Sequence, residues 1–329
     1  MAAGAAELPR DQLDLGLRRF SGAAHERADE ARGWRQAGLP AHAERIGPCG
    51  RALPHRGARE RPGGGRIGDA ARGPAPLARR QDADHRARRA ELTSETQTKL
   101  WALAAFVAAL AFAASPFLAP GFKGFEPTQF PVPQVDPAVQ PAGYAFSIWG
   151  LIYVWLLLGT GYGLWKRADD PDWAPMRPAL VASLAVGALW LPVAEASVPL
   201  ATLLIWIMLG TALVAVMRAG DTDRWWQLAP VAIYAGWLTA ASSVSIGLVL
   251  AGYGILPETP AALLALVLAL RIAVTVQYRL HRAPEYGITV IWALAAVIVA
   301  NAAPFNAAVV GLAVLGIGAI LAIRGTDTE

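Results

Sequence analysis

The sequence predicts an all-α protein, a polytopic membrane helix bundle of about eight spans behind a long arginine-rich N-terminal segment. Three observations support this prediction. Apolar runs close to the length of a spanning helix recur from residue 98 to the C-terminus. Basic residues gather in every second loop between these runs. Tryptophans lie near the ends of several runs, where an indole ring prefers the headgroup layer of a bilayer.

The N-terminal segment, residues 1–97, differs in composition from the rest of the chain. It holds 18 of the 29 Lys and Arg residues, all of them Arg, and it has no sustained apolar run. So few large apolar side chains cannot offset the conformational entropy of folding, and we expect this segment to be disordered. One interpretation is a cytoplasmic arm that contacts anionic lipid headgroups. The composition also fits GC-rich sequence translated from a start codon placed too early, and we favour this second interpretation.

Eight apolar runs are predicted to span the membrane. Pro199 separates the third run from the fourth, and Pro304 separates the last two, because proline ends a helix at or before the residue that precedes it. The first run begins too far from the N-terminus for a signal peptide, so we interpret it as a span. The runs are 99–119, 144–165, 178–197, 199–217, 228–250, 260–278, 287–302 and 304–323.

The basic residues of the loops predict the orientation of these spans. With the N-terminus inside, the inner loops and the C-terminal end hold eight Lys and Arg residues, whereas the outer loops hold Lys123 alone. The positive-inside rule therefore favours an even number of spans with both termini in the cytoplasm. We expect an integral protein of the bacterial inner membrane whose partner is the lipid bilayer and not nucleic acid.

Few residues within the runs can carry polar chemistry. Cys49 is the only cysteine and lies in the N-terminal segment, and no histidine lies inside a run, so we expect no metal site and no haem held by an intramembrane histidine. Motifs of soluble hydrolases and phosphate-binding loops are missing, which makes a membrane enzyme the least supported class. Glu195 and Arg271 are candidate coupling groups, although either could instead reach water from its position in the helix.

An aromatic set in the second to fifth runs is the best indication of a binding site. Trp149 and Tyr153 lie one turn apart and therefore share a helix face. Several rings turned toward the bundle interior would form a flat apolar cavity suited to a planar or sterol-like ligand, and the alternative is that they fill a core. The set consists of Tyr144, Phe146, Trp149, Tyr153, Trp190, Trp206, Tyr234 and Trp237.

Three sequence stretches indicate a family. They are Pro141-Ala-Gly-Tyr-Ala-Phe-Ser-Ile-Trp149 with Tyr153 after it, Trp190-Leu-Pro192, and Trp237-Leu-Thr-Ala-Ala241. In these stretches residues 99–250 resemble the tryptophan-rich sensory protein, or translocator protein, family, once called the peripheral-type benzodiazepine receptor. Tyr144 stands where this family usually has Trp, and three spans follow residue 253 that the five-helix members lack.

The resemblance implies an organisation and a set of site residues. Residues 98–253 would form a five-helix bundle that encloses a pocket, and residues 254–329 would add a three-helix extension. The candidate ligand-binding residues are Tyr144, Phe146, Trp149, Tyr153, Trp190, Pro192, Trp206, Trp237 and Ala241.

The resemblance also implies a function, because family members bind porphyrins, haem and sterol-like molecules. We therefore expect a membrane binding or sensory protein without a covalent cofactor, with a tetrapyrrole such as porphyrin or haem as the first candidate ligand. The alternative is a transporter of a small hydrophobic or amphipathic solute. Glycines one turn apart, such as Gly159 and Gly163, allow close helix contacts, which leaves a homodimer open.

Overall fold

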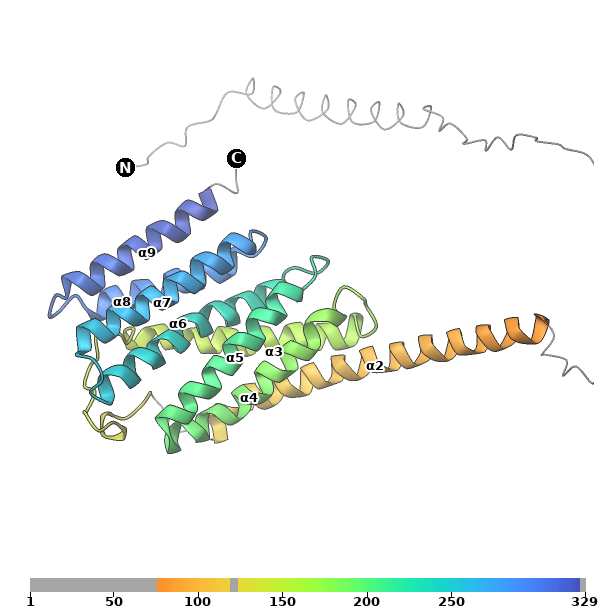
Figure 1. Ribbon diagram of the computed structural model, residues 1–329, viewed down its shortest axis with the longest axis horizontal. Helices are drawn as coiled ribbons and strands as arrows, with labels where there is room; N and C mark the ends of the chain where they lie inside the picture. The colour runs from red at the N-terminus through yellow and green to blue at the C-terminus, as the bar shows by residue number, and fades with distance from the viewer. Residues whose placement is uncertain (1–75, 119–123, 326–329) are drawn as a thin grey trace, which may run out of the picture. The chain divides into compact units, whose positions relative to one another are not determined.

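A computed structural model describes residues 76–118 and 124–325 (Figure 1). The described residues form eight α-helices, three short 3₁₀ helices and connecting loops, without a named strand. The α-helices are α2 (Pro76–Leu118), α3 (Ile148–Lys166), α4 (Arg177–Ala196), α5 (Val198–Arg218), α6 (Leu228–Gly252), α7 (Glu258–Arg279), α8 (Pro284–Ala300) and α9 (Ala307–Gly325). The 3₁₀ helices are η1 (Pro127–Gln129), η2 (Gly143–Ser147) and η3 (Ala174–Met176).

The structure confirms the polytopic membrane helix bundle. Seven of the described helices are long and apolar enough to cross a bilayer. The remaining apolar helix, α8, has 17 residues, which is about 25 Å of helix and the lower end of the range for a span. The eight predicted runs coincide with α2 to α9 to within a few residues, except that α2 begins well before its run.

The N-terminal segment does not end at residue 97 as a separate region. Residues 76–97 continue α2 as a helix, while residues 1–75 lie outside the described part of the chain. After Pro76 this stretch is rich in Ala, Arg, Glu and Leu, which are good helix formers. It extends a helix that the first span already nucleates, so it needs no new nucleus and no apolar core of its own.

The described helices form one compact unit with α6 at its centre. Helix α2 packs against α3 and α4, α4 against α5, and α5 against α6. On its other side α6 packs against α7 and α8, and α9 covers both of these helices (Figure 1). The proposed boundary at residue 253 therefore runs along a continuous packed interface.

Small and hydroxyl-bearing residues let α6 lie close to its neighbours. A Cβ atom at Gly236 would lie 2.6 Å from the carbonyl oxygen of Tyr286, so the backbones of α6 and α8 touch there. The Tyr286 hydroxyl is 2.8 Å from the Thr239 hydroxyl, and the Tyr234 hydroxyl is 2.9 Å from that of Ser183 on α4. Such close approach and interhelical hydrogen bonding drive helix association where lipid is as apolar as the core.

One end of the bundle, called here the basic end, carries the loops between α3 and α4, α5 and α6, and α7 and α8. Asp223 is its hub: it accepts hydrogen bonds from Arg167 Nε at 2.7 Å, from Trp173 Nε1 at 3.1 Å and from the Tyr162 hydroxyl at 3.3 Å. The bond from Arg167 holds the pKa of Asp223 below its usual range, and Asp223 in turn raises the pKa of Arg167. Trp173 is thus a buried donor and not a lipid-interface anchor.

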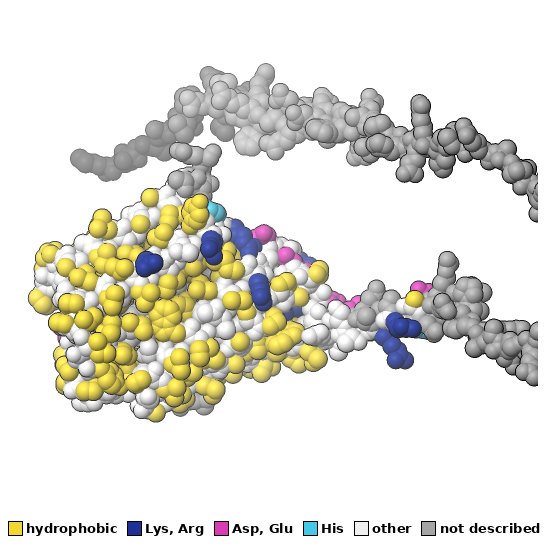
Figure 2. Space-filling model, in the orientation of Figure 1, with side chains coloured by type: hydrophobic (Ala, Val, Ile, Leu, Met, Phe, Trp, Pro, Cys, Tyr) yellow, Lys and Arg dark blue, Asp and Glu magenta, His cyan; other side chains and the backbone are white. Residues whose placement is uncertain are grey.

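Two further ion pairs join the loop between α5 and α6 to α8 and to the loop between α7 and α8. Arg224 pairs with the nearly buried Glu285 at 2.7 Å, and Arg282 pairs with Asp221 at 2.5 Å. The face drawn in Figure 2 is largely hydrophobic, and its Lys and Arg side chains lie mostly toward this end. An apolar belt with charges at a helix-end layer is the surface that a bilayer requires.

The opposite end is covered by the described residues of the connection from α2 to α3, residues 124–147, called here the roof loop. It is tied to α4 by Gln129 Nε2, which donates to the Ala194 carbonyl at 3.0 Å, and to α6 by the Val132 amide, which donates to Gly252 at 2.8 Å. Asn301 Nδ2 donates to the Ala138 carbonyl at 2.8 Å while also capping α8. The roof loop is therefore anchored on both halves of the bundle.

Candidate functional site

A cavity of ≈ 360 Å³, called here the aromatic cavity, lies inside the bundle below the roof loop. Each of the helices from α2 to α6 contributes to its wall, and so does η2. Rings make up much of this wall. The ring-bearing lining residues are Phe112, Phe146, Trp149, Tyr153, Trp190 and Trp237.

The rings of this wall are held by contacts with one another. Trp149 and Tyr153, one turn apart on α3, stack with their centroids 5.5 Å apart and their planes 18° apart. Trp237 meets Trp149 edge to face at 6.1 Å, and Phe146 meets Trp237 in the same way at 5.8 Å. These distances fall in the range of favourable aromatic pairs, so the rings fix one another's orientation.

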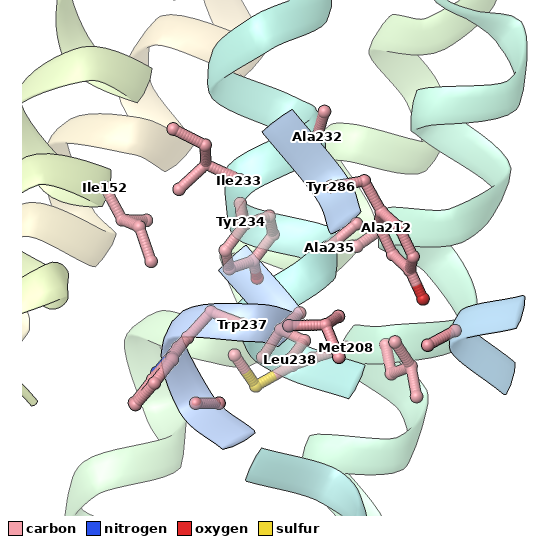
Figure 3. Packing of buried hydrophobic residues seen from close by; sticks show 14 of the residues in the cluster. Ile152, Met208, Ala212, Ala232, Ile233, Tyr234, Ala235, Trp237, Leu238 and Tyr286 are labelled. Carbon is pink, nitrogen blue, oxygen red and sulfur yellow. The ribbon is translucent and has the colours of Figure 1, made fainter. Parts of the chain in front are cut away.

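Helix α6 presents these rings to the first half of the bundle. Figure 3 shows Tyr234 and Trp237 on the side of Ile152 of α3, with Tyr286 of α8 toward the other side of the view. Tyr234 is fully buried behind the cavity wall, where its ring lies 5.6 Å from that of Phe112. The aromatic cavity is therefore backed by packed rings and not by empty space.

Six of the nine predicted ligand-binding residues lie on the wall of the aromatic cavity. The residues brought together are Phe146, Trp149, Tyr153, Trp190, Trp237 and Ala241. Tyr144 is half exposed and packs on Trp292 of α8, at a centroid distance of 5.4 Å. Pro192 is exposed on α4, and Trp206 follows Ile205 on α5 but does not reach the lining. These three predicted residues are therefore not part of the cavity.

Phe112 lines the aromatic cavity but is not among the ligand-binding residues predicted from the sequence. It lies in the alanine-rich part of α2, and its ring is 4.9 Å from Tyr153 and 5.9 Å from Trp149. Gly187 on α4 makes room for it, because a Cβ there would lie 2.6 Å from the Phe112 ring. Gly187 is the sequence feature that could have indicated this contact. It is the only glycine in α4 and lies three residues before Trp190.

The two candidate coupling groups lie outside the cavity. Glu195 is exposed near the end of α4, and its backbone carbonyl accepts a hydrogen bond from Gln129. Arg271 is exposed on the outer surface of α7. Neither side chain lines either cavity, so the structure does not bring these charges to the candidate site.

A second, smaller cavity of ≈ 90 Å³, called here the aliphatic cavity, adjoins the first on the other side of α6. Its wall comes from α6, α7, α8 and the roof loop, and most of it is Ala, Val and Leu. The two cavities share a set of border residues. These are Gly124, Phe146, Trp190, Ile205, Trp237 and Ala241.

The chemistry of the two cavities is almost wholly apolar. Among the described residues, the lining of neither cavity includes Lys, Arg, His, Cys, Asp or Glu. Trp190 donates its indole N–H to the Ala201 carbonyl at 2.8 Å, whereas the buried indole N–H of Trp237 has no hydrogen-bond partner. This arrangement can bury an uncharged planar molecule and offer it hydrogen bonds from groups such as the Trp237 N–H and the Tyr153 hydroxyl, but it holds no charged side chain to neutralise a charge.

Fold and site together define a class: a polytopic membrane helix bundle with an apolar ligand-sized cavity closed by a loop. The particular family follows from comparison with known proteins. A model of the TSPO-like protein family matches residues 96–324, and the chain belongs to this family. The match covers α7, α8 and α9 as well as the first five helices. Searches of curated proteins and of solved structures returned no match.

Proposed function

We propose that this protein binds an uncharged planar or sterol-like apolar ligand in the aromatic cavity. The observation that carries the proposal is the ring of six aromatic side chains around a volume of ≈ 360 Å³. An apolar cavity of about 150 Å³ already binds benzene, so this one is large enough for a molecule of several fused rings. Membership of the TSPO-like family supports a ligand-binding or sensory role.

A tetrapyrrole remains the first candidate ligand, on the strength of the family resemblance. Without His or Cys in the lining, binding would rest on stacking, apolar burial and the free Trp237 N–H, and not on iron ligation. The carboxylates of a natural porphyrin would find no cation on the cavity wall, and burying them there is costly. The proposal therefore predicts that removal of these charges strengthens binding.

The test is a titration of the full chain in detergent with protoporphyrin IX and with its dimethyl ester, followed by tryptophan quenching and the Soret band. We expect saturable binding, tighter for the ester. Trp149→Ala and Trp237→Ala should each weaken it about tenfold or more, because each removes one ring from the wall. Trp165→Ala is the matched control, since that ring is 78% exposed and far from the lining. Quenching that is non-saturating and equal in all variants would contradict the proposal.

Transport, the alternative function, gains no support from the arrangement of charges. It relied on Glu195 and Arg271 as coupling groups, and both lie on outer surfaces of the bundle.

A homodimer stays a prediction. Gly163 already packs within the chain, against the Trp173 ring, whereas Gly311 and Gly318 on α9 have nothing within 4 Å of an added Cβ.

The orientation of the bundle is also part of the proposal: we infer that the basic end faces the cytoplasm. The support is the positive-inside rule applied to the loops at that end. The test uses Thr222→Cys at the basic end and Val135→Cys in the roof loop, each in a Cys49→Ser background. In spheroplasts an impermeant maleimide should label the cysteine at position 135, where the native Val135 is 70% exposed. It should not label the cysteine at position 222. The reverse labelling pattern would show the opposite orientation.

A further inference from the structure

The aliphatic cavity differs from the aromatic cavity in both chemistry and origin. Away from the shared border, most of its wall consists of small and branched aliphatic side chains of α6, α7 and α8 beneath the roof loop. Examples are Ala265 on α7 and Ala293 on α8, both almost fully buried. The roof loop contributes Val139, Gln140, Pro141 and one ring, Phe125, and α6 adds Ser243 and Ser245. A mainly aliphatic wall offers dispersion contact to a flexible chain.

The sizes of the two cavities decide what each can hold. The aromatic cavity, at ≈ 360 Å³, is about four times larger than the aliphatic cavity, at ≈ 90 Å³. An apolar void of about 150 Å³ takes a single benzene ring, so the smaller aliphatic cavity has no room for a fused ring system. It is nevertheless much larger than the space that one water needs, and its apolar wall disfavours water.

The two cavities adjoin along a border of shared lining residues. Ala241 and Ile205 line both sides of it, together with the edge-to-face pair of Phe146 and Trp237. A ring that stacks in the aromatic cavity would therefore lie beside the aliphatic cavity. The methyl side chain of Ala241 leaves more room at this border than the larger residues around it.

We infer that the ligand of this protein is a planar ring that carries one short aliphatic branch, with the ring in the aromatic cavity and the branch in the aliphatic cavity. This inference rests on the proposed function and adds the ligand class to it. Helices α7 and α8 thereby become part of the binding site, because they select for the branch. A ring without a branch leaves the aliphatic cavity empty and forfeits the burial of several methylene groups.

The experiment compares two uncharged probes, menadione and its prenylated derivative, in titrations of the full chain by tryptophan quenching in one detergent. The prenyl group should tighten binding about tenfold, since each buried CH₂ contributes several-fold in affinity. Ala293→Leu and Ala269→Leu, on different helices, fill the aliphatic cavity and should reduce this gain to less than about twofold. Ala300→Leu, an exposed position on the same helix as Ala293, is the matched control and should retain the full gain.

Menadione binding separates the possible outcomes. Both filled variants should bind menadione as the wild type does, which shows that they are folded and that the aromatic cavity is intact. If the wild type binds menadione but gains nothing from the prenyl group, the inference is wrong and the proposed function stands. The inference is equally wrong if the gain persists in both filled variants. If neither probe binds saturably to the wild type, the aromatic cavity is no binding site, and both proposals fail.

Discussion

Trp237 contributes to the shape of both cavities through a single side chain. It is 2% exposed, borders both cavities, and holds Phe146 and Trp149 in place through edge-to-face contacts. Its unpaired indole N–H contrasts with that of Trp190, which is satisfied by a backbone carbonyl of α5. A buried donor without a partner is uncommon in folded proteins, and a bound ligand with an acceptor oxygen would satisfy it.

Asp223 plays the comparable part at the basic end, and it makes the stability of the bundle depend on pH. Its pKa is lowered mainly by the hydrogen bond from Arg167, with further support from Trp173. A carboxyl whose pKa is depressed in the folded state contributes stability that is fully present above its unfolded pKa of about 3.9. That contribution is lost as the pH falls through the folded pKa.

Asp223→Asn should therefore lower the free energy of unfolding by about 2 kcal/mol at neutral pH. The difference from wild type should shrink as the pH is lowered below about 4, because the wild-type carboxyl then becomes protonated as well. Thermal unfolding in detergent across this range measures it. Asp169→Asn is the control, since its side chain is 61% exposed and its pairing with Lys99 is weak. If Asp223→Asn lowers the free energy of unfolding by the same amount at every pH, the charge of Asp223 is not the cause of the loss.

At the scale of elements, α6 and the roof loop set the geometry of the site. Most residues of α6 are buried, since the helix serves as a wall for both cavities and contacts four other helices. The roof loop is held by hydrogen bonds to α4 through Gln129, to α6 through the Val132 amide, to α7 through Glu258 and to α8 through Asn301. The Asn301 side-chain amide makes two hydrogen bonds there: it caps α8 and also donates to the Ala138 carbonyl of the roof loop.

Gly236→Ala tests the contact between α6 and α8. The added methyl would meet the Tyr286 carbonyl at 2.6 Å, and backbone on both sides limits relaxation. We expect a destabilisation of about 1–3 kcal/mol, as for other overpacked sites. Gly210→Ala on α5 has open space around the added methyl and should be neutral or slightly stabilising. Equal thermal stability of the two variants would mean that the close contact is absent in the protein.

At the scale of the whole molecule, α6 packs against helices that lie on both sides of residue 253 in the sequence. The α6 surface that faces α7 and α8 carries Gly236, Thr239 and Ser243, and the ion pair of Arg224 with Glu285 crosses the same interface. The family match extends through this region to residue 324. The last three helices are therefore a structural part of the bundle and supply one wall of the aliphatic cavity.

A chain that ends at Gly254 should consequently fail to give a monodisperse five-helix protein. Removal of α7 to α9 exposes the close-packed face of α6 and leaves Arg224 without its carboxylate partner. Size-exclusion chromatography in detergent measures the outcome. Co-expression of residues 255–329 as a separate chain should restore a folded complex, because spanning helices can associate after insertion. A stable truncated protein that still binds menadione would show that the first five helices are autonomous.

Most of the helical architecture follows from the sequence because a membrane imposes a local rule. Every span must satisfy its own backbone within one apolar run, so counting such runs predicted α3 to α9 closely. The same rule says nothing about how each helix is rotated about its axis, since lipid and protein core are equally apolar. For this reason the aromatic set was predictable as a group, but the exclusion of Tyr144, Pro192 and Trp206 and the inclusion of Phe112 were not.

By itself the sequence determined a helical membrane bundle, its spans and its family resemblance, and it indicated a set of aromatic residues as candidates for a common site. Only the tertiary structure decided which rings surround the aromatic cavity, that Trp173 is a buried donor to Asp223, and that α7 and α8 enclose a second cavity. The physical reason is that cavities arise between helices distant in sequence. Their shape depends on helix rotation and on close contacts such as that of Gly187 with Phe112, which no local pattern encodes.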